Sequence, residues 1–160
     1  MPLRHQTPGY ASVTTRYELN QGTQTIPEDS SASGADGEPA VILIAEDHLD
    51  SRDAMRALLE AFGYRVVVAA NGREAVDLAL EHDPDLILMD IMMPELDGFE
   101  ATRAIRRHGQ LGAVPIIAVT AMEGAHHLAI QAGADDYVRK PIDIRRLVAK
   151  VKDWLDGRDG

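Results

Sequence analysis

The chain has 160 residues, of which 45% are hydrophobic and 26% charged, a balance typical of a globular protein with material for one core. Its 16 basic and 26 acidic side chains give a net charge of −10, which argues against binding nucleic acid or an anionic membrane surface. The absence of cysteine excludes a disulfide framework and a thiolate zinc site. No apolar run reaches the roughly 20 residues of a membrane span, and the first residues lack a signal-peptide core, so we expect a cytoplasmic location.

The first 39 residues differ in composition from the rest of the chain. Ser, Thr, Gln, Gly and Pro dominate them, and aliphatic residues are few. This composition predicts a flexible, disordered arm over 1–39, one folded domain over 40–157 and a short tail over 158–160. Tyr10 and Tyr17 leave open a short docking element within the arm.

From residue 40 onward the pattern alternates between strand and helix about five times. The strand candidates are nearly continuous apolar runs, which are typical of strands covered on both faces of a parallel sheet. They are Val41–Ala45, Arg65–Ala69, Leu86–Asp90, Val114–Val119 and Asp136–Arg139. The pattern therefore predicts an α/β fold, a doubly wound five-stranded parallel sheet with helices on both faces.

The segments between these strands carry apolar residues at helical spacing. Two of the helices should begin with capping boxes, because Asn71 precedes Glu74 by three residues and Asp97 precedes Glu100 by three. Gly133 stands where the fourth helix should end. The six histidines are scattered and lack the spacing of a metal-binding pair, so we interpret them as surface residues.

Polar side chains follow the predicted strands at their carboxyl ends. Asp90 closes the third strand, and Thr120 and Lys140 follow the fourth and fifth. The acidic pair Glu46 and Asp47 follows the first strand. Because the carboxyl ends of parallel strands meet at one edge of an open sheet, we expect these side chains to lie close together. A proline follows the lysine, which makes that bond a candidate cis peptide bond that would aim the lysine inward.

These residue types match the needs of phosphoryl transfer to a carboxylate. An ionised Asp90 can attack phosphorus without a base, while the Thr120 hydroxyl and the Lys140 ammonium can stabilise charge on the phosphoryl oxygens. Two acids about 4 Å apart repel by roughly 4 kcal/mol at an effective dielectric of about 20. Crowded acids therefore predict a hard divalent cation, and Mg²⁺ fits best. Each residue alone has an ordinary explanation as a cap, turn or surface residue, but their joint placement favours a site.

Four motifs give the chain from about Val41 to Gly157 a resemblance to a known family. It resembles the receiver domain of two-component response regulators, including the single-domain chemotaxis type, which has a flavodoxin-like fold. The matching motifs are Ile44–Asp47, Leu88–Gly98, Ala118–Ala121 and Ala132–Pro141. Together they are highly specific.

The resemblance implies that Asp90 accepts a phosphoryl group from a histidine kinase or a histidine phosphotransfer protein. It implies that Mg²⁺ binds at Asp47, Asp90 and the Met92 carbonyl, with Glu46 acting through water. It also implies that the backbone amides of Met92 and Ala121 contact the phosphoryl oxygens.

The resemblance further implies a switch. Thr120 would shift toward the phosphate and Tyr137 would rotate inward, which alters the face built from the fourth helix, the fifth strand and the fifth helix. That face would bind a downstream protein target. We expect a monomer or weak homodimer with no nucleic-acid or membrane partner of its own, and no enzymatic activity beyond autocatalytic phosphoryl acceptance and slow self-dephosphorylation.

The chain departs from the common family pattern in its loops. The stretch from Thr120 to Lys140 is about two residues shorter than the usual spacing, which predicts a fourth helix that starts late or is reduced. Met92 and Met122 stand two residues beyond Asp90 and Thr120, positions that in receivers flank the path of the hydrolytic water. Because a thioether orients water poorly, we hypothesise a long-lived acyl phosphate, although the two methionines could simply pack the loops.

Three alternatives remain at this stage. The chain could be the C-terminal receiver of a hybrid sensor kinase, with the arm before residue 40 as its linker. It could be a receiver-fold interaction module that no longer takes phosphate. A phosphohydrolase of the haloacid dehalogenase type also uses an Asp nucleophile and magnesium, but it needs a second Asp at the position that Met92 occupies here.

Overall fold

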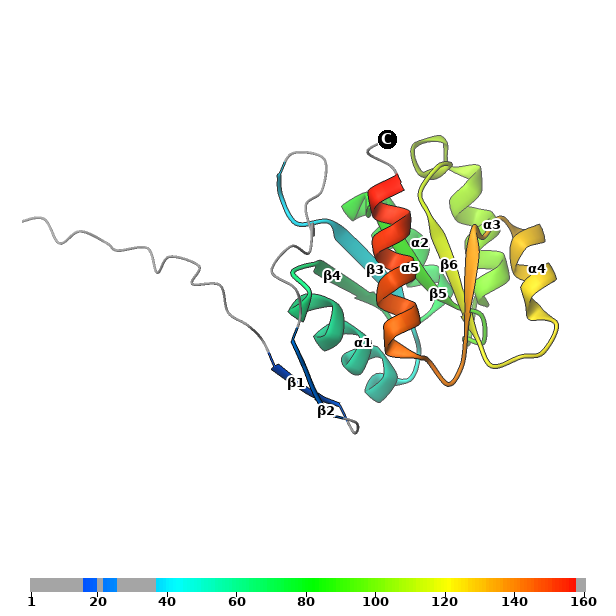
Figure 1. Cartoon of the computed structure of the whole chain (residues 1–160). Coiled ribbons are helices and arrows are strands. Elements are labelled where there is room, and N and C mark those ends of the chain that lie inside the picture. The colour runs from blue at the N-terminus through cyan, green and yellow to red at the C-terminus, as the bar shows by residue number, and fades with distance from the viewer. Residues whose placement is uncertain (1–15, 20–21, 26–36, 158–160) are drawn as a thin grey trace, which may run out of the picture. The chain divides into compact units, whose positions relative to one another are not determined.

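The computed structural model of the protein describes residues 16–19, 22–25 and 37–157, and the chain divides into two units, Met1–Ser31 and Ala32–Gly160 (Figure 1). In the first unit, β1 (Arg16–Leu19) pairs antiparallel with β2 (Gly22–Thr25). The sequence pattern does not predict this hairpin. Most of the arm predicted as disordered, and the whole of the tail, lie outside the described residues, so the predicted division of the chain stays a prediction.

The described part of the second unit contains one sheet of five parallel strands in the order β4-β3-β5-β6-β7. The strands are β3 (Val41–Ala45), β4 (Arg65–Ala69), β5 (Leu86–Asp90), β6 (Ile116–Thr120) and β7 (Asp136–Arg139). The helices are α1 (Leu49–Ala61), α2 (Gly72–His82), α3 (Gly98–Arg107), α4 (Ala125–Ala132) and α5 (Ile144–Asp156), with a 3₁₀ helix, η1, at Gly109–Leu111. The predicted doubly wound parallel sheet is confirmed.

Helices cover both faces of this sheet. In Figure 1, α1 and α5 lie in front of the sheet and α2 and α3 lie behind it. The buried side chains form two matching core clusters, one against α1 and α5 and the other against α2, α3 and α4. In the described part of the chain, no helix combines the length and the apolar character that a membrane crossing requires.

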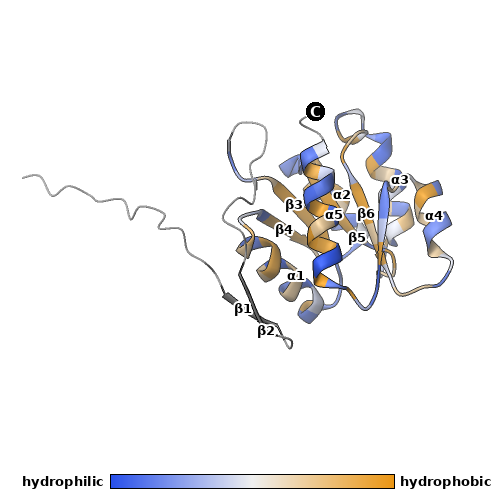
Figure 2. Cartoon of the chain, viewed as in Figure 1, coloured by the Kyte–Doolittle hydropathy of each residue, from blue (hydrophilic) through white to orange (hydrophobic). Residues whose placement is uncertain are grey.

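Strand β3 shows why the strand sequences are continuously apolar. Ile42 and Ile44 point into the core on the α1 and α5 side, whereas Leu43 and Ala45 point into the core on the opposite side. The first cluster adds Met55, Leu59, Leu147 and Val151, and the second adds Ala75, Ala79, Ile105 and Ala129. Each fully buried aliphatic side chain contributes about 1.5 to 3 kcal/mol. Figure 2 accordingly shows the inner strands in orange, while the helices carry both orange and blue.

The predicted start of the fourth strand is wrong by two residues. β6 begins at Ile116 rather than at Val114, because Pro115 has no amide hydrogen to donate to the sheet. The Pro115 carbonyl accepts a hydrogen bond from the Ile87 amide at 2.9 Å, and the Val114 amide donates to Leu111 in the preceding turn at 3.3 Å. At its other end, β6 includes Thr120 as its last residue, whereas the predicted strand ends at Val119.

The helix ends follow the predicted capping residues. Asn71 accepts a hydrogen bond from the Glu74 amide at 2.8 Å, and Asp97 accepts one from the Glu100 amide at 2.9 Å. Gly133 ends α4 with a φ of +115°, a conformation that favours glycine. α4 has eight residues, whereas α1, α2, α3 and α5 have 10 to 13, which confirms the predicted reduction of the fourth helix.

The strand order creates a topological switch point at the carboxyl ends of β3 and β5. From β3 the chain first adds β4 on one side and then crosses to add β5 on the other. The loops that leave β3 and β5 therefore diverge from neighbouring strand ends. In open α/β sheets ligands bind at this switch point, outside the carboxyl ends of the strands.

Candidate functional site

Two acidic side chains are buried at the switch point. Asp90 is the last residue of β5, and Glu46 follows β3; their side chains are 3% and 0% exposed. Met89 of β5 aligns with Ala45 of β3, which places the two acids at neighbouring strand ends. Because a buried carboxylate without a partner is costly, each of them needs a donor or a cation.

Lys140 supplies part of what the two acids need. It follows β7, and its Nζ donates to Glu46 Oε2 and to Asp90 Oδ2, at 3.1 Å in each case. Its amide donates to the Thr120 carbonyl at 2.8 Å, and the peptide bond to Pro141 is cis, as the sequence suggested. The predicted convergence of the lysine with the buried acids is thus observed, although Lys140 is separated from Glu46 by 94 positions and from Asp90 by 50.

The pKa values of these groups reflect the crowding. Burial raises the pKa of Glu46 to about 7, aided by the hydrogen bond and the negative charge of Asp90, and Lys140 offsets this only in part. Burial alone would lower the pKa of Lys140, but the hydrogen bonds and charges of Asp90 and Glu46 outweigh it and raise that pKa. One lysine therefore does not neutralise the negative charge collected here.

Asp47 adds a third acid beside the switch point. The His48 Nδ1 atom lies 3.2 Å from Asp47 Oδ1 and 3.4 Å from Glu46 Oε1, and the His48 side chain is 73% exposed. The three residues offer ligand atoms within 4.8 Å of one another. His48 is on the surface, as expected, but its place in this cluster was missed. Its position directly after the acidic pair was the available signal.

These residues fit a hard divalent cation. Glu46, Asp47 and Asp90 supply carboxylate oxygens, which are the donors that Mg²⁺ prefers. Two buried acids share one lysine, and burial, together with the hydrogen bond and the charge of Asp90, raises the pKa of Glu46. A cation with several oxygen ligands would relieve the repulsion.

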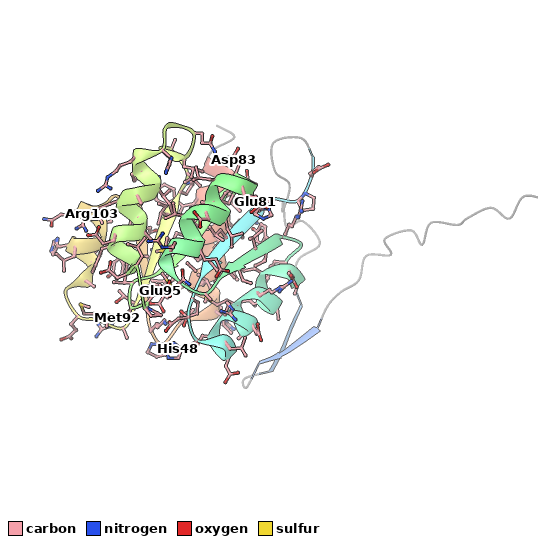
Figure 3. The ribbon with its side chains drawn as sticks, turned by 180° about the vertical axis from the view of Figure 1, so that it is seen from behind. His48, Glu81, Asp83, Met92, Glu95 and Arg103 are labelled. Atoms are coloured by element: carbon pink, nitrogen blue, oxygen red, sulfur yellow. The ribbon has the colours of Figure 1, made fainter. Side chains whose placement is uncertain are left out.

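Two loop amides point back at the side chains that end the strands. The Met92 amide donates to Asp90 Oδ1 at 3.1 Å, and the Met122 amide donates to Thr120 Oγ1 at 3.0 Å. The predicted contacts of the Met92 and Ala121 amides with phosphoryl oxygens both stay predictions. Figure 3 shows Met92 and His48 at the same end of the molecule, opposite Glu81 and Asp83.

Gly98 closes the loop that follows Asp90. The Gly98 amide donates to the Ile91 carbonyl at 3.0 Å, and Asp97 caps α3 directly beside it. A Cβ atom at Gly98 would overlap the Asp90 carbonyl oxygen and lie 2.7 Å from Ile91 Cα. The loop can therefore fold back over the strand end only because this residue has no side chain.

The two proposed switch residues lie on neighbouring strands. Thr120 is buried at the end of β6, where the preceding Val119 aligns with Asp90. Tyr137 is half-buried on β7, aligned with Ala118, and its ring stacks on His126. The structure thus places Thr120 at the carboxyl end of β6 and Tyr137 near the start of β7, and their switching roles stay predictions.

Arg52 is a rim residue that the sequence analysis missed. It lies in α1, and its Nη1 donates to the Glu46 carbonyl at 3.3 Å, while its buried Nε has no hydrogen-bond partner in the structure. An arginine near the start of a helix is ordinary, so no sequence signal marked it. Its guanidinium helps to hold the backbone from which Glu46 projects.

Comparison with known proteins adds independent information. The family model described as the response regulator receiver domain matches residues 42–152. The polar-differentiation response regulator DivK of Brucella anthropi is 42% identical over 119 residues, which cover 73% of this chain and 97% of that protein.

Solved structures of receivers share the fold. The receiver domain of the sensor histidine kinase PA1611 from Pseudomonas aeruginosa, with a magnesium ion coordinated in its active site cleft, is 39% identical, with a TM-score of 0.69 and coverage of 73% of this chain and 98% of that chain. The Vibrio cholerae chemotaxis protein CheY4 is 30% identical, with a TM-score of 0.69 over 72% of this chain and 98% of its own. The Saccharomyces cerevisiae receiver of Ssk1, crystallised with the histidine phosphotransfer protein Ypd1, is 28% identical, with a TM-score of 0.70 over 74% and 90%.

Proposed function

The chain belongs to the response regulator receiver family of two-component signalling, and from this premise we propose that Asp90 is its phosphoryl acceptor. The proposed donor is a histidine kinase or a histidine phosphotransfer protein, the class of partner seen with the Ssk1 receiver. The proposed readout is a downstream protein target. We propose no enzymatic activity beyond phosphoryl acceptance and slow self-dephosphorylation.

One observation carries this proposal. Asp90 is buried at the switch point, with Oδ2 on the Lys140 ammonium and Oδ1 on the Met92 amide. A carboxylate held on both oxygens is fixed in orientation, which a nucleophile requires. The same two donors lie where charge would develop on an arriving phosphoryl group.

The proposed reaction transfers the phosphoryl group without change in oxidation state. An Asp90 oxygen bonds to phosphorus, the bond from phosphorus to the donor's imidazole nitrogen breaks, and its electron pair stays on the imidazole. Lys140 then exchanges its contact with Asp90 for a phosphoryl oxygen, and the Thr120 hydroxyl donates to another. The amides of Met92 and Ala121 complete the proposed set of donors.

Mg²⁺ is the proposed cofactor. When bound, it supplies positive charge that offsets the charge of the acids and of the phosphoryl oxygens. The residues that would hold it are Asp47, Asp90 and the Met92 carbonyl, with Glu46 acting through water. The three carboxylates of this set make the fit.

Other finer points of the proposal rest on the family. Thr120 and Tyr137 would carry the switch, in which the face of α4, β7 and α5 changes. A cytoplasmic location and a monomer or weak homodimer complete the proposal. Cell fractionation and light scattering before and after phosphorylation would test these last two points.

Mass spectrometry after treatment with acetyl phosphate and Mg²⁺ tests the acceptor. We expect a phosphate-sized mass gain in the native chain and none in Asp90→Asn. Glu95→Gln is the matched control, because Glu95 is an exposed acid in the same loop. Glu95→Gln should gain the same mass as the native chain. A gain that survives Asp90→Asn would place the acceptor elsewhere.

The hybrid-kinase context is a second candidate, favoured by the similarity to the receiver of the sensor kinase PA1611. In that context Asp90 would accept the phosphoryl group from a kinase domain in the same polypeptide. The chemistry at Asp90 is the same in both contexts. The reading frame of the source gene distinguishes them.

A further inference from the structure

A histidine packs directly on the proposed switch tyrosine. The rings of His126 and Tyr137 are stacked, with their centroids 4.3 Å apart and their planes 27° from parallel. Tyr137 is half-buried and packs against the core cluster on the α2, α3 and α4 side, whereas His126 is exposed. The imidazole therefore packs on the ring of a tyrosine that also contacts the core.

The short loop after β6 determines where His126 lies. Four residues, 121–124, join Thr120 to α4, and Gly124 turns the chain into the helix with a φ of +76°. Ala125 and Ala129 are buried residues of α4, and Ala129 belongs to the core cluster on this side of the sheet. His126 thus stands one residue after the helix begins, close to the loop that Thr120 leads into.

The same loop has a second connection to β7. Glu123 accepts a hydrogen bond from Arg139 Nη2 at 3.4 Å, two residues beyond Tyr137. Thr120 itself aligns with Arg139 across the two strands. A displacement of the Thr120 loop would therefore move Glu123 and His126 together, relative to the strand that carries Tyr137.

Tyr137 also borders the surface from which a partner would read the switch. It lines a groove of about 600 Å³ together with Arg139, Arg146 and Lys150, on the side of β7 next to α5. Tyr137 is therefore both the stacking partner of His126 and one of the residues that line this groove. A displacement of Tyr137 would alter the lining of the groove.

We propose that His126 is a positioning residue that holds the Tyr137 ring in its resting place and so sets how readily phosphorylation moves it. This inference rests on the proposed function of Asp90 and Tyr137. A stacked aromatic pair contributes about 1 kcal/mol beyond burial, which corresponds to roughly a fivefold change in the ratio of the two ring positions. Loss of the stack should change the switching midpoint by about that factor.

Fluorine NMR of protein containing 3-fluorotyrosine tests the inference. The chain has four tyrosines, and the Tyr137→Phe variant identifies the Tyr137 signal by its loss. Beryllofluoride with excess Mg²⁺ stands in for the phosphoryl group on Asp90. The position of the Tyr137 signal reports its aromatic neighbour, and the beryllofluoride concentration at half-response reports the coupling to Asp90.

The variants separate stacking from a general effect on α4. We expect His126→Ala to move the resting Tyr137 signal and to change the half-response concentration about fivefold, while His126→Phe keeps both close to the native values. His127→Ala is the matched control, because it removes the neighbouring imidazole, whose ring lies 5.4 Å from that of His126. This control should behave like the native chain.

Two results would overturn the inference. One is a Tyr137 signal and half-response in His126→Ala that match those of His127→Ala. The other is a native Tyr137 signal that ignores beryllofluoride although mass spectrometry shows phosphate on Asp90, and this result leaves the proposed phosphoryl acceptance standing. Absence of any mass gain on Asp90 would instead contradict the proposed function.

Discussion

The strands of the central sheet carry acidic side chains both at their amino ends, which form the amino edge of the sheet, and at their carboxyl ends, which form the carboxyl edge. The acids at these two edges have opposite surroundings. At the amino ends of the strands, Asp85 accepts a hydrogen bond from the Val41 amide at 2.7 Å, and Asp135 accepts one from the Ile116 amide at 2.9 Å. At the carboxyl ends, Glu46 and Asp90 share the ammonium of Lys140. The acids at the amino ends are hydrogen-bonded to backbone amides of the sheet. The acids at the carboxyl ends carry more negative charge than their one lysine offsets.

The direction of the strands explains the difference. The amino end of a parallel strand presents amide hydrogens that lack a sheet partner, so an acid there finds a donor at once. Asp136 shows the result: burial alone would raise its pKa, but hydrogen bonds from Lys150, Trp154 and the Tyr137 amide outweigh burial and lower it. At the opposite edge burial raises the pKa of Glu46. The carboxyl edge, where burial raises the pKa of an acid instead of hydrogen bonds lowering it, is therefore the edge suited to bind a cationic ligand.

Arg106→Ala should disrupt the hydrogen bonds at the amino edge and cause the largest loss of stability. Its guanidinium donates to the carbonyls of Gly133 and Val114 at 2.8 and 2.6 Å and to Asp135 at 2.7 Å. Removing it takes this donor from both carbonyls and the charged partner from Asp135, and we expect the free energy of unfolding, measured in urea, to fall by about 3 kcal/mol. Arg103→Ala is the control in the same helix, where an exposed pair with Glu100 should contribute only about 0.5 kcal/mol. Equal losses in both variants would contradict a special role for Arg106.

Met92→Asn, at the carboxyl edge, should change the rate at which phosphate is lost from Asp90. Met92 and Met122 are 60% and 41% exposed, so both thioethers stand at the open rim beside Asp90 and Thr120. An amide in place of Met92 can hold the attacking water, and we expect phosphate loss to accelerate about fivefold to tenfold, equivalent to roughly 1 kcal/mol. The rate is measured by mass spectrometry after the phosphate donor is removed. Leu128→Asn, on exposed α4, should not change it, and an unchanged rate in Met92→Asn would remove the hypothesis of a long-lived acyl phosphate.

Neutralising one acid should have opposite effects at the two edges. Without divalent cations, Asp90→Asn should raise the free energy of unfolding by about 1 kcal/mol, because it relieves the repulsion with Glu46. Asp135→Asn should lower it by about 1 kcal/mol, because the Arg106 guanidinium loses its charged partner. Added Mg²⁺ should stabilise the native chain and not Asp90→Asn. A loss of stability in Asp90→Asn would show that the lysine pair outweighs the crowding of acids.

The pH dependence of stability should show the smallest effect. Because the pKa of Asp136 is lowered in the folded chain, its contribution is present above the ordinary value of 3.8 and is lost as the pH falls through the folded pKa. Asp136→Asn should therefore flatten the acid limb of the stability profile, by less than about 1 kcal/mol. Trp154→Phe removes one donor and keeps an aromatic ring, so it should have an intermediate effect. An acid limb identical to the native one in Asp136→Asn would refute this assignment.

Sequence patterns predicted the sheet and the set of residues at its carboxyl edge. The apolar runs located all five parallel strands, and both boundary errors fell on β6, whose predicted start at Val114 came from treating Pro115 as a strand residue. The acids, Thr120 and Lys140 were identified because they directly follow apolar runs. His48 was missed as a neighbour of the acids, although its position directly after Glu46 and Asp47 was a signal in the sequence.

Local order in the sequence decided the strands, the helix caps and the edge on which the acids lie, because apolar periodicity and capping act over a few residues. Tertiary structure alone decided which side chains meet: Lys140 between Glu46 and Asp90, Arg106 with Asp135, and His126 on Tyr137. These pairs depend on strand register, helix placement and loop length, so no short-range pattern encodes them. The chemistry proposed here needs both, since the sequence supplies the acids and only the packed sheet brings them to one lysine.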